Sequence, residues 1–457
     1  MTVPHSKNSY MPLAVPLYGE EFAADPGSIY TRLRAFGPVA PVEISPGVSA
    51  YLVTDRQAAM ELLNDTETWA KDPRAWESGL PPESPVRPML GWRPNALFND
   101  GQAHRRYRSV ITDSLSRVEP HRLRQQVADI ADGLIREFGA TGEADLVVQY
   151  ARPLPLILFN AMFGMPEEDG PRLVAALGGM FDAKPENAIK ANEDFSQYMT
   201  ELITLKSQKR GEDLTSWFMD HPAGLSTDEL AAEVVLTMAA GQEPTTNLIS
   251  NSLSRMLSNP DYYSTLSNGA LTAYDAVDDV LRNEPPMANY SAHFPRANVH
   301  FHGTWIPANA LVLVSYHAAN TTPDDLLTGG GNSSPLSGSS EPRSDGGAHL
   351  AWSAGPHACP AKQPALLVAV TAIERLTSHL GDLELAVPRE QLQWRPGPFH
   401  RALSHLPAHF TPITPQKTGV TPWSSPSSST RQAGTSTESP WPSGSAGPRP
   451  VSYSPGM

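Results

Sequence analysis

The longest helical pattern in the chain lies between Ser226 and Met256. Ser226 and Glu229 stand at the spacing of a capping box, which marks the start of a helix. Apolar residues then recur at helical spacing for about thirty residues, a length that would cross a whole domain. The apolar positions are Leu230, Val234, Val235, Met238, Leu248, Ile249, Leu253 and Met256.

A proline lies in the middle of this predicted helix. Pro244 has no amide hydrogen, so the carbonyl of Ala240 loses its helical partner and we expect a kink there. A kink at the centre of a helix that crosses the core reflects either packing or a functional site.

The rest of the pattern is mainly helical. A second clear helix is predicted from Pro360 to Gly381, where apolar residues again recur at helical spacing. Strand-like segments are short and cover residues 49–53, 299–305 and 311–314. The expected fold is therefore mainly α, with a small β region.

Low-complexity segments indicate the domain boundaries. Residues 415–457 are about two-thirds Ser, Thr, Pro or Gly, and this composition predicts a disordered tail. Residues 328–347 have the same character and are predicted to be a flexible insert. With residues 1–11 as an N-terminal arm, residues 12–414 are expected to form one folded domain.

Charge and hydropathy narrow the classes of partner. The formal net charge is −14 and the pI is about 5.4, which is poorly suited to nucleic acid. The most apolar stretch, from Leu154 to Met165, is about a dozen residues long and too short to cross a bilayer. The first residues carry no cationic segment followed by an apolar run, so the protein is expected to be cytoplasmic, without a membrane partner.

The chain contains one cysteine, Cys359. A single thiol cannot form an internal disulfide, and it cannot supply the thiolates of a cysteine-rich zinc site or an iron–sulfur cluster. A buried residue without chemistry, a nucleophile and a lone axial ligand of haem remain possible. The first of these is the commonest for an isolated free cysteine.

The residues around Cys359 carry a distinctive pattern. Positions 349–361 read HLAWSAGPHACPA and are followed by the predicted helix. This segment resembles the haem-binding loop of the cytochromes P-450, in which an aromatic residue, Gly, His and Cys stand at fixed spacing before a long helix. Trp352 stands where the family usually has Phe, and Ala361 stands where it usually has the last Gly. The resemblance extends over residues 12–410.

The resemblance implies a role for each part of this loop. Cys359 would be the thiolate ligand of the iron of haem b, and an axial thiolate favours O–O bond cleavage. Gly355 would permit a tight turn under the porphyrin, and Trp352 would shield the sulfur. A position at the start of a helix would favour the thiolate form of Cys359.

Basic residues elsewhere match the positions where the family holds the haem propionates. His104 and Arg108 resemble its H-x-x-x-R motif, and their i, i+4 spacing places both on one helix face. Without this context they would more simply form a solvated basic helix. His293 falls where the family usually has a propionate-binding Arg. The resemblance also implies His349 as a partner, and His357 either as another or as a residue that lines the turn.

The long predicted helix carries a segment that resembles the oxygen-activation motif of the family, A-G-x-[D/E]-T. Here Ala240, Gly241 and Glu243 match, but Pro244 occupies the position of the alcohol. In the family the acid–alcohol pair relays protons to dioxygen. Thr245 is the nearest alcohol and is taken as a candidate catalytic residue with Ala240, Gly241, Glu243 and Pro244, although it lies about 100° further round the helix. Water or a hydroxyl group of the substrate is the alternative way to complete the relay.

A buried ion pair is also implied by the resemblance. Asp279 and Arg282 stand where the family has its E-x-x-R motif, with Arg343 as the expected third member. We expect these residues to stabilise the fold and not to take part in catalysis, whether or not the resemblance holds. Aspartate is one methylene shorter than glutamate, so the pair must be weaker or be reached differently.

The resemblance implies a haem-thiolate monooxygenase that oxidises a small apolar organic molecule with O2, as in natural-product tailoring. Electrons would come from a ferredoxin and ferredoxin reductase, docking at Arg105 or Arg106 and Lys362. Two alternatives remain: radical coupling of aromatic or cyclic-dipeptide substrates, and a degenerate haem-binding sensor or partner protein.

Overall fold

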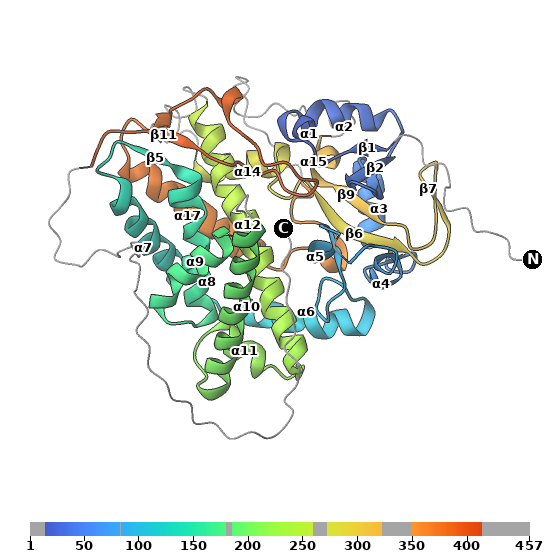
Figure 1. Ribbon diagram of the computed structural model, residues 1–457, viewed down its shortest axis with the longest axis horizontal. Coiled ribbons are helices and arrows are strands. Elements are labelled where there is room, and N and C mark those ends of the chain that lie inside the picture. Colours follow the sequence, from blue (N-terminus) through green and yellow to red (C-terminus); the bar gives the residue numbers. More distant parts are fainter. Residues whose placement is uncertain (1–13, 83, 180–184, 259–271, 322–348, 414–457) are drawn as a thin grey trace, which may run out of the picture.

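The computed structural model describes residues 14–82, 84–179, 185–258, 272–321 and 349–413. The predicted arm (1–11), insert (328–347) and tail (415–457) lie outside these residues, as does Arg343. The described chain has a helical region and a smaller sheet region, which lie side by side in Figure 1. The prediction of a mainly α fold with a small β region is confirmed.

The helical region is built around α12, which spans Thr227–Leu257. Its start is the predicted capping box: Ser226 Oγ accepts from the Glu229 amide, and the Glu229 carboxylate accepts from the Ser226 amide. The other helices of this region are α7 (Pro120–Phe138), α8 (Pro153–Phe163), α9 (Gly170–Gly179), α10 (Pro185–Gln208), α11 (Leu214–Met219), α14 (Ala273–Asn283) and α17 (Lys362–His379). Short 3-10 or π segments are Val147–Ala151, Glu167–Asp169, Gly355–His357 and Arg389–Gln391.

The sheet region is built on a six-stranded sheet with the order β1-β2-β3-β9-β6-β4. Its strands are β1 (Val15–Pro16), β2 (Val39–Ser45), β3 (Val48–Val53), β4 (Trp69–Ala70), β6 (Asn289–Pro295) and β9 (Val312–Ser315). The helices of this region are α1 (Glu20–Ala24), α2 (Pro26–Arg34), α3 (Arg56–Asn64), α4 (Arg74–Glu77), α5 (Arg87–Leu90) and α15 (Tyr316–Asn320).

Two smaller sheets complete the strands of the described chain. The strands β5 (Glu143–Asp145), β10 (Glu384–Leu385) and β11 (Pro407–His409) form one sheet, and β7 (Val299–Phe301) and β8 (Thr304–Ile306) form the other. The single strand predicted at residues 299–305 is therefore wrong. His302 and Gly303 both have positive φ, the geometry of a tight hairpin turn, and the chain reverses there.

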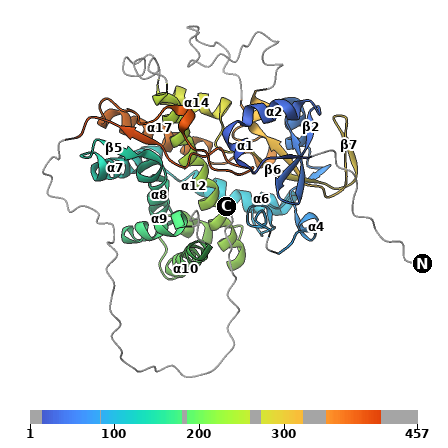
Figure 2. The same cartoon turned by 45° about the horizontal axis from the view of Figure 1, so that its top comes forward.

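The helical region and the six-stranded sheet each have a hydrophobic core. Side chains of α7, α8, α12, α14 and α17 form one core, and the six-stranded sheet packs with α2 to form another. Helix α6 (Gly101–Leu115) packs against α12 from the other side, so α12 lies between α8 and α6 (Figures 1 and 2). The predicted site residues on α6, on α12 and ahead of α17 are thereby placed around the middle of the molecule.

Candidate functional site

The cysteine loop is held by main-chain geometry. The Cys359 amide donates to the Trp352 carbonyl at 2.8 Å, and the Ala358 amide donates to the Gly355 carbonyl at 3.1 Å. Gly355 has φ +68°, and a Cβ at this position would come within 2.1 Å of the Leu63 carbonyl oxygen at the end of α3. Only glycine combines this left-handed backbone with so close an approach. The sequence prediction of a tight turn at Gly355 is confirmed.

A cationic side chain, that of Arg108, lies beside the Cys359 thiol. Helix α17 begins at Lys362, so Cys359 lies in the loop before the helix and not in its first turn. The Arg108 guanidinium on α6 donates to the Ala358 carbonyl, next to the cysteine. Burial raises the pKa of the Cys359 thiol, whereas the Ala361 amide and the Arg108 charge lower it. Arg108 and Ala361 therefore favour the thiolate that a metal ligand must be.

Four basic side chains converge beside this loop. The rings of His104 and His357 stack with centroids 4.0 Å apart. His357 Nε2 lies 4.0 Å from the Asp100 carboxylate at the start of α6. His293 on β6 and Lys71 after β4 complete the group, and both are buried. Burial together with the positive charges of the neighbours lowers the pKa of every histidine in this group.

His349 occupies a different place from the other three predicted histidines. Its Nε2 lies 3.8 Å from Asp278 Oδ1 on α14, and its Nδ1 accepts from the Ala351 amide at 3.2 Å. Burial lowers the pKa of His349 to about 4. The structure therefore brings His104, Arg108, His293 and His357 together and positions His349 against α14.

The buried acid of the predicted ion pair has a partner that the sequence pattern did not name. Asp279, with 2% of its side chain exposed, pairs with the Arg255 guanidinium on α12 and accepts from Asn283 at 2.8 Å. Arg282 Nε donates to Asp278 at 2.7 Å. The prediction that Asp279 belongs to a buried ion pair is sound, but the partner on α12 was missed because it lies 24 residues away.

One face of α12 is exposed to solvent near the middle of the helix, and we call it the open face. Ala239 and Ala240 are exposed although the helix around them is largely buried. Thr245 is buried, as expected of a residue turned away from Ala240. A Cβ on Gly241 would meet the Phe159 ring at 2.6 Å, so glycine here permits α8 to pack closely. The helix is continuous through Pro244, so the proline does not divide it.

Glu243 is engaged by another element. It forms an ion pair with Arg395, from the segment after α17, and its Oε1 accepts from the Asn247 side chain at 3.3 Å. Gln242 Nε2 donates to the Thr246 hydroxyl at 3.3 Å. The acid of the predicted relay is therefore held by a cation, while Pro244 beside it has no hydroxyl.

Among the buried charged residues that were not found from the sequence, two lie near this site. One is Lys71, and the only local feature of the sequence that could have indicated its burial is the short strand before it. The other is Glu233, whose Oε1 accepts from the Ala96 amide at 2.7 Å, while Oε2 has no hydrogen-bond partner within the described part of the chain. Burial raises the pKa of Glu233 to about 8. Its position within the apolar pattern of the long helix was a usable signal.

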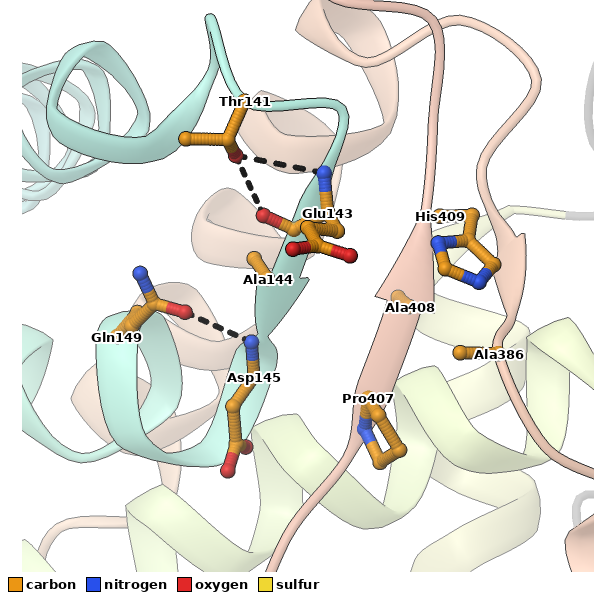
Figure 3. A pocket seen from close by; sticks show the side chains of 9 residues that line it. All are labelled: Thr141, Glu143, Ala144, Asp145, Gln149, Ala386, Pro407, Ala408 and His409. Atoms are coloured by element: carbon orange, nitrogen blue, oxygen red, sulfur yellow. Dashed lines mark hydrogen bonds between the residues drawn. The ribbon is translucent and has the colours of Figure 1, made fainter.

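The pocket in Figure 3 lies elsewhere. It has a volume of about 340 Å³ and is bordered by β5, β11 and the residue after β10. It contains none of the predicted site residues. Exposed polar groups such as Glu143 and His409 line it beside Ala144 and Ala408, so it gives no support to a second reaction centre.

The donor set fits a haem. One thiol precedes α17, a buried basic group can receive two carboxylates, and His104 Nε2 is buried without a hydrogen-bond partner among the described residues. The exposed alanines of α12 leave room beside the helix. In the described ranges, no group of three or more His, Cys, Asp or Glu could hold a metal ion.

Comparisons with known proteins identify the relatives of this chain. No family model matches the chain. It is 32% identical over 399 residues to the cytochrome P450 monooxygenase PikC of Streptomyces venezuelae, covering 86% of this chain and 92% of that protein. It is 26% identical to the 6-deoxyerythronolide B hydroxylase of Saccharopolyspora erythraea, covering 86% and 98%.

Solved structures give the same result. Testosterone-bound CYP154C4 from Streptomyces sp. superposes with a TM-score of 0.77 at 26% identity, covering 87% of this chain and 98% of that chain. CYP154A1 from Streptomyces coelicolor gives 0.75 at 26% identity, covering 87% and 100%.

The fold and the matches therefore define a haem-containing monooxygenase. The chain belongs to the cytochrome P-450 family. Among its described helices, none has both the length and the apolar character needed to cross a membrane.

Proposed function

We propose that this chain is a haem-thiolate monooxygenase that tailors a natural product, with Cys359 as the axial ligand of haem b. The observation that carries the proposal is the construction of the cysteine loop. Gly355 allows the loop to pack closely against α3, and Arg108 of α6 donates a hydrogen bond to the loop. When bound, the haem would supply oxygen activation, which an axial thiolate favours.

The protein residues then divide the remaining tasks. His104, His357 and Arg108 bind the propionate edge of the cofactor, and Gly355 and Trp352 shape the loop under the sulfur. Ala240 and Gly241 form the small-residue part of α12. Glu243 is held by Arg395, and Pro244 supplies no hydroxyl, so a proton must reach oxygen through water or through the substrate itself.

The substrate class follows from the relatives and from the open face of α12. The named relatives include a hydroxylase of 6-deoxyerythronolide B and further enzymes of polyketide biosynthesis. A bulky, largely apolar natural product is the corresponding substrate here. Within α12, Met238 is buried, whereas Ala240 is exposed.

We further propose that electrons come from a ferredoxin and its reductase. Arg105 and Lys362 are exposed near the cysteine side and are suited to an acidic partner. Arg106 is excluded from this role, because its guanidinium binds Glu229 at 2.7 Å and also the carbonyls of Ala223 and Gly224.

Replacement of the thiol tests the proposal. Cys359→Ser should abolish the red-shifted Soret band of the reduced carbon-monoxide complex, because that band depends on thiolate ligation. Ala358→Ser adds the same hydroxyl one residue away and should keep the band. Persistence of the band in Cys359→Ser would show that another group binds the iron and that the proposed ligand is wrong.

One observation favours a second candidate function. The pairing of Glu243 with Arg395, next to Pro244, suits an oxidase that couples aromatic or cyclic-dipeptide units by radical chemistry without inserting oxygen. Product analysis under 18O2 separates the two. Label in the product supports tailoring by hydroxylation, and an unlabelled coupled product supports the second candidate.

A further inference from the structure

The basic group beside the cysteine loop contains a lysine that the sequence pattern did not reveal. Strand β4 pairs antiparallel with β6, with Trp69 opposite Pro295 and Ala70 opposite Phe294. Continuing this register by one residue places Lys71 opposite His293. Opposite residues of an antiparallel pair project to the same face, so both side chains lie on one side of the sheet.

Lys71 is unusually buried for a lysine. Only 4% of the residue is exposed, and its Nζ donates to the Ser291 hydroxyl at 3.2 Å. A buried ammonium is costly unless a negative charge accompanies it. Burial lowers the pKa of Lys71 to about 7, with Asp100 as the opposing charge.

Asp100 does not balance the positive groups around it. Its carboxylate accepts from the Lys71 backbone amide at 2.8 Å and lies 3.4 Å from the Arg296 guanidinium. Lys71 and His357 lie close to this carboxylate, and the pKa of each of the three histidines in the group is lowered, first by burial and then by neighbouring cations. The arrangement lacks negative charge, which the two propionates of a haem would supply.

His293 is poorly placed to donate to a propionate. Its Nδ1 lies 2.5 Å from the Ser291 carbonyl oxygen, which can only accept, so Nδ1 carries the proton. In the neutral ring Nε2 then has no hydrogen and cannot donate to a carboxylate. Lysine, with three donors and no acceptor, has no such restriction.

We propose that Lys71 is a propionate-binding residue of this chain and supplies the positive charge that the family usually takes from an arginine at the position of His293. The inference rests on the proposed haem site and extends it to the residue that follows β4. His293 then contributes no charge to the propionates and leaves that role to Lys71.

A simpler role for Lys71 would be to join β4 to β6 through Ser291. The two roles predict different results. A hydrogen bond that only links the two strands requires Ser291 as much as Lys71 and does not depend on the positive charge. A propionate ligand requires the charge, tolerates arginine, and influences how firmly the haem is held.

Haem loss from the ferric holoenzyme to excess apomyoglobin tests the proposal. Lys71→Met should accelerate haem loss about tenfold, the effect of losing one charge-assisted hydrogen bond. Lys71→Arg should stay within about twofold of the parent, since it keeps the charge. Lys209→Met removes an exposed lysine just after the end of α10 and serves as the control.

A second readout is the reduction potential of the haem. It should shift downward in Lys71→Met, because removing a positive charge disfavours the more negative ferrous state, and it should remain at the parent value in Lys71→Arg. Equal haem loss in Lys71→Met and the parent would overturn the proposal, and so would an equal acceleration in Ser291→Ala. If Lys71→Met does not fold, Lys71→Gln replaces it. The spectrum of Cys359→Ser tests the haem site separately, so the two failures can be told apart.

Discussion

The cysteine loop and the middle of α12 differ in how their functional groups are fixed. In the loop, hydrogen bonds between residues less than ten positions apart and the left-handed φ of Gly355 set the geometry. On α12, side chains are fixed by partners far away in sequence: Glu243 by Arg395 and Arg255 by Asp279. Local main-chain geometry can be read from a motif, whereas such distant pairing cannot.

The largest effect is expected where the loop meets α3. In Gly355→Ala the new Cβ would come 2.1 Å from the Leu63 carbonyl oxygen, so the loop must shift and haem loading should fall to a small fraction. Haem content after purification is the measurement. Gly47→Ala is the matched control, because Gly47 has φ +77° with open space around it.

Gly47→Ala should cost only the left-handed backbone term, about 1–2 kcal/mol, and keep the haem. If Gly355→Ala loads haem as fully as Gly47→Ala does, then the close approach to α3 does not set the loop. Local hydrogen bonds and the backbone of Gly355 alone would then fix the loop, which would sharpen the contrast with α12.

An intermediate effect is expected at the distant pair of α12. Asp279→Ala leaves the Arg255 guanidinium without its buried partner, and such a loss costs about 3–5 kcal/mol. Because Arg255 is 22% exposed, we expect the lower end of that range. Thermal unfolding of the holoenzyme should show a clear decrease in melting temperature.

Asp278→Ala provides the comparison within the same helix. Asp278 is 31% exposed and pairs with Arg282, so its loss should cost no more than about 1 kcal/mol. A larger decrease for Asp278→Ala than for Asp279→Ala would mean that the α14 pair, and not the link to α12, is the structural one.

The same contrast explains what the sequence could predict. The capping box at Ser226 and the turn at Gly355 depend on neighbouring residues, and both were predicted. Strand β6 was missed because its partners, β4 and β9, come from separate parts of the chain. Lys71 and Arg395 were missed for the same reason, since neither has a local pattern that reveals its buried partner.

The smallest effect is expected at Pro244. Pro244→Thr restores the amide that the Ala240 carbonyl lacks and adds the hydroxyl of the family motif. Glu243 nevertheless remains paired with Arg395, so the acid of the relay is still engaged. We expect product per electron to change less than about twofold, well below the two to four powers of ten that a complete acid–base step can contribute.

Product formed and peroxide released per electron measure this outcome with any accepted substrate. Thr245→Val is the control, because Thr245 is buried and its hydroxyl is not expected to serve the relay. A marked rise in product per electron in Pro244→Thr would mean that the proline is a handicap and that Glu243 can leave Arg395 during turnover. An unchanged yield would instead mean that the proton comes from water or substrate, because adding the missing alcohol beside a paired acid does not rebuild a relay.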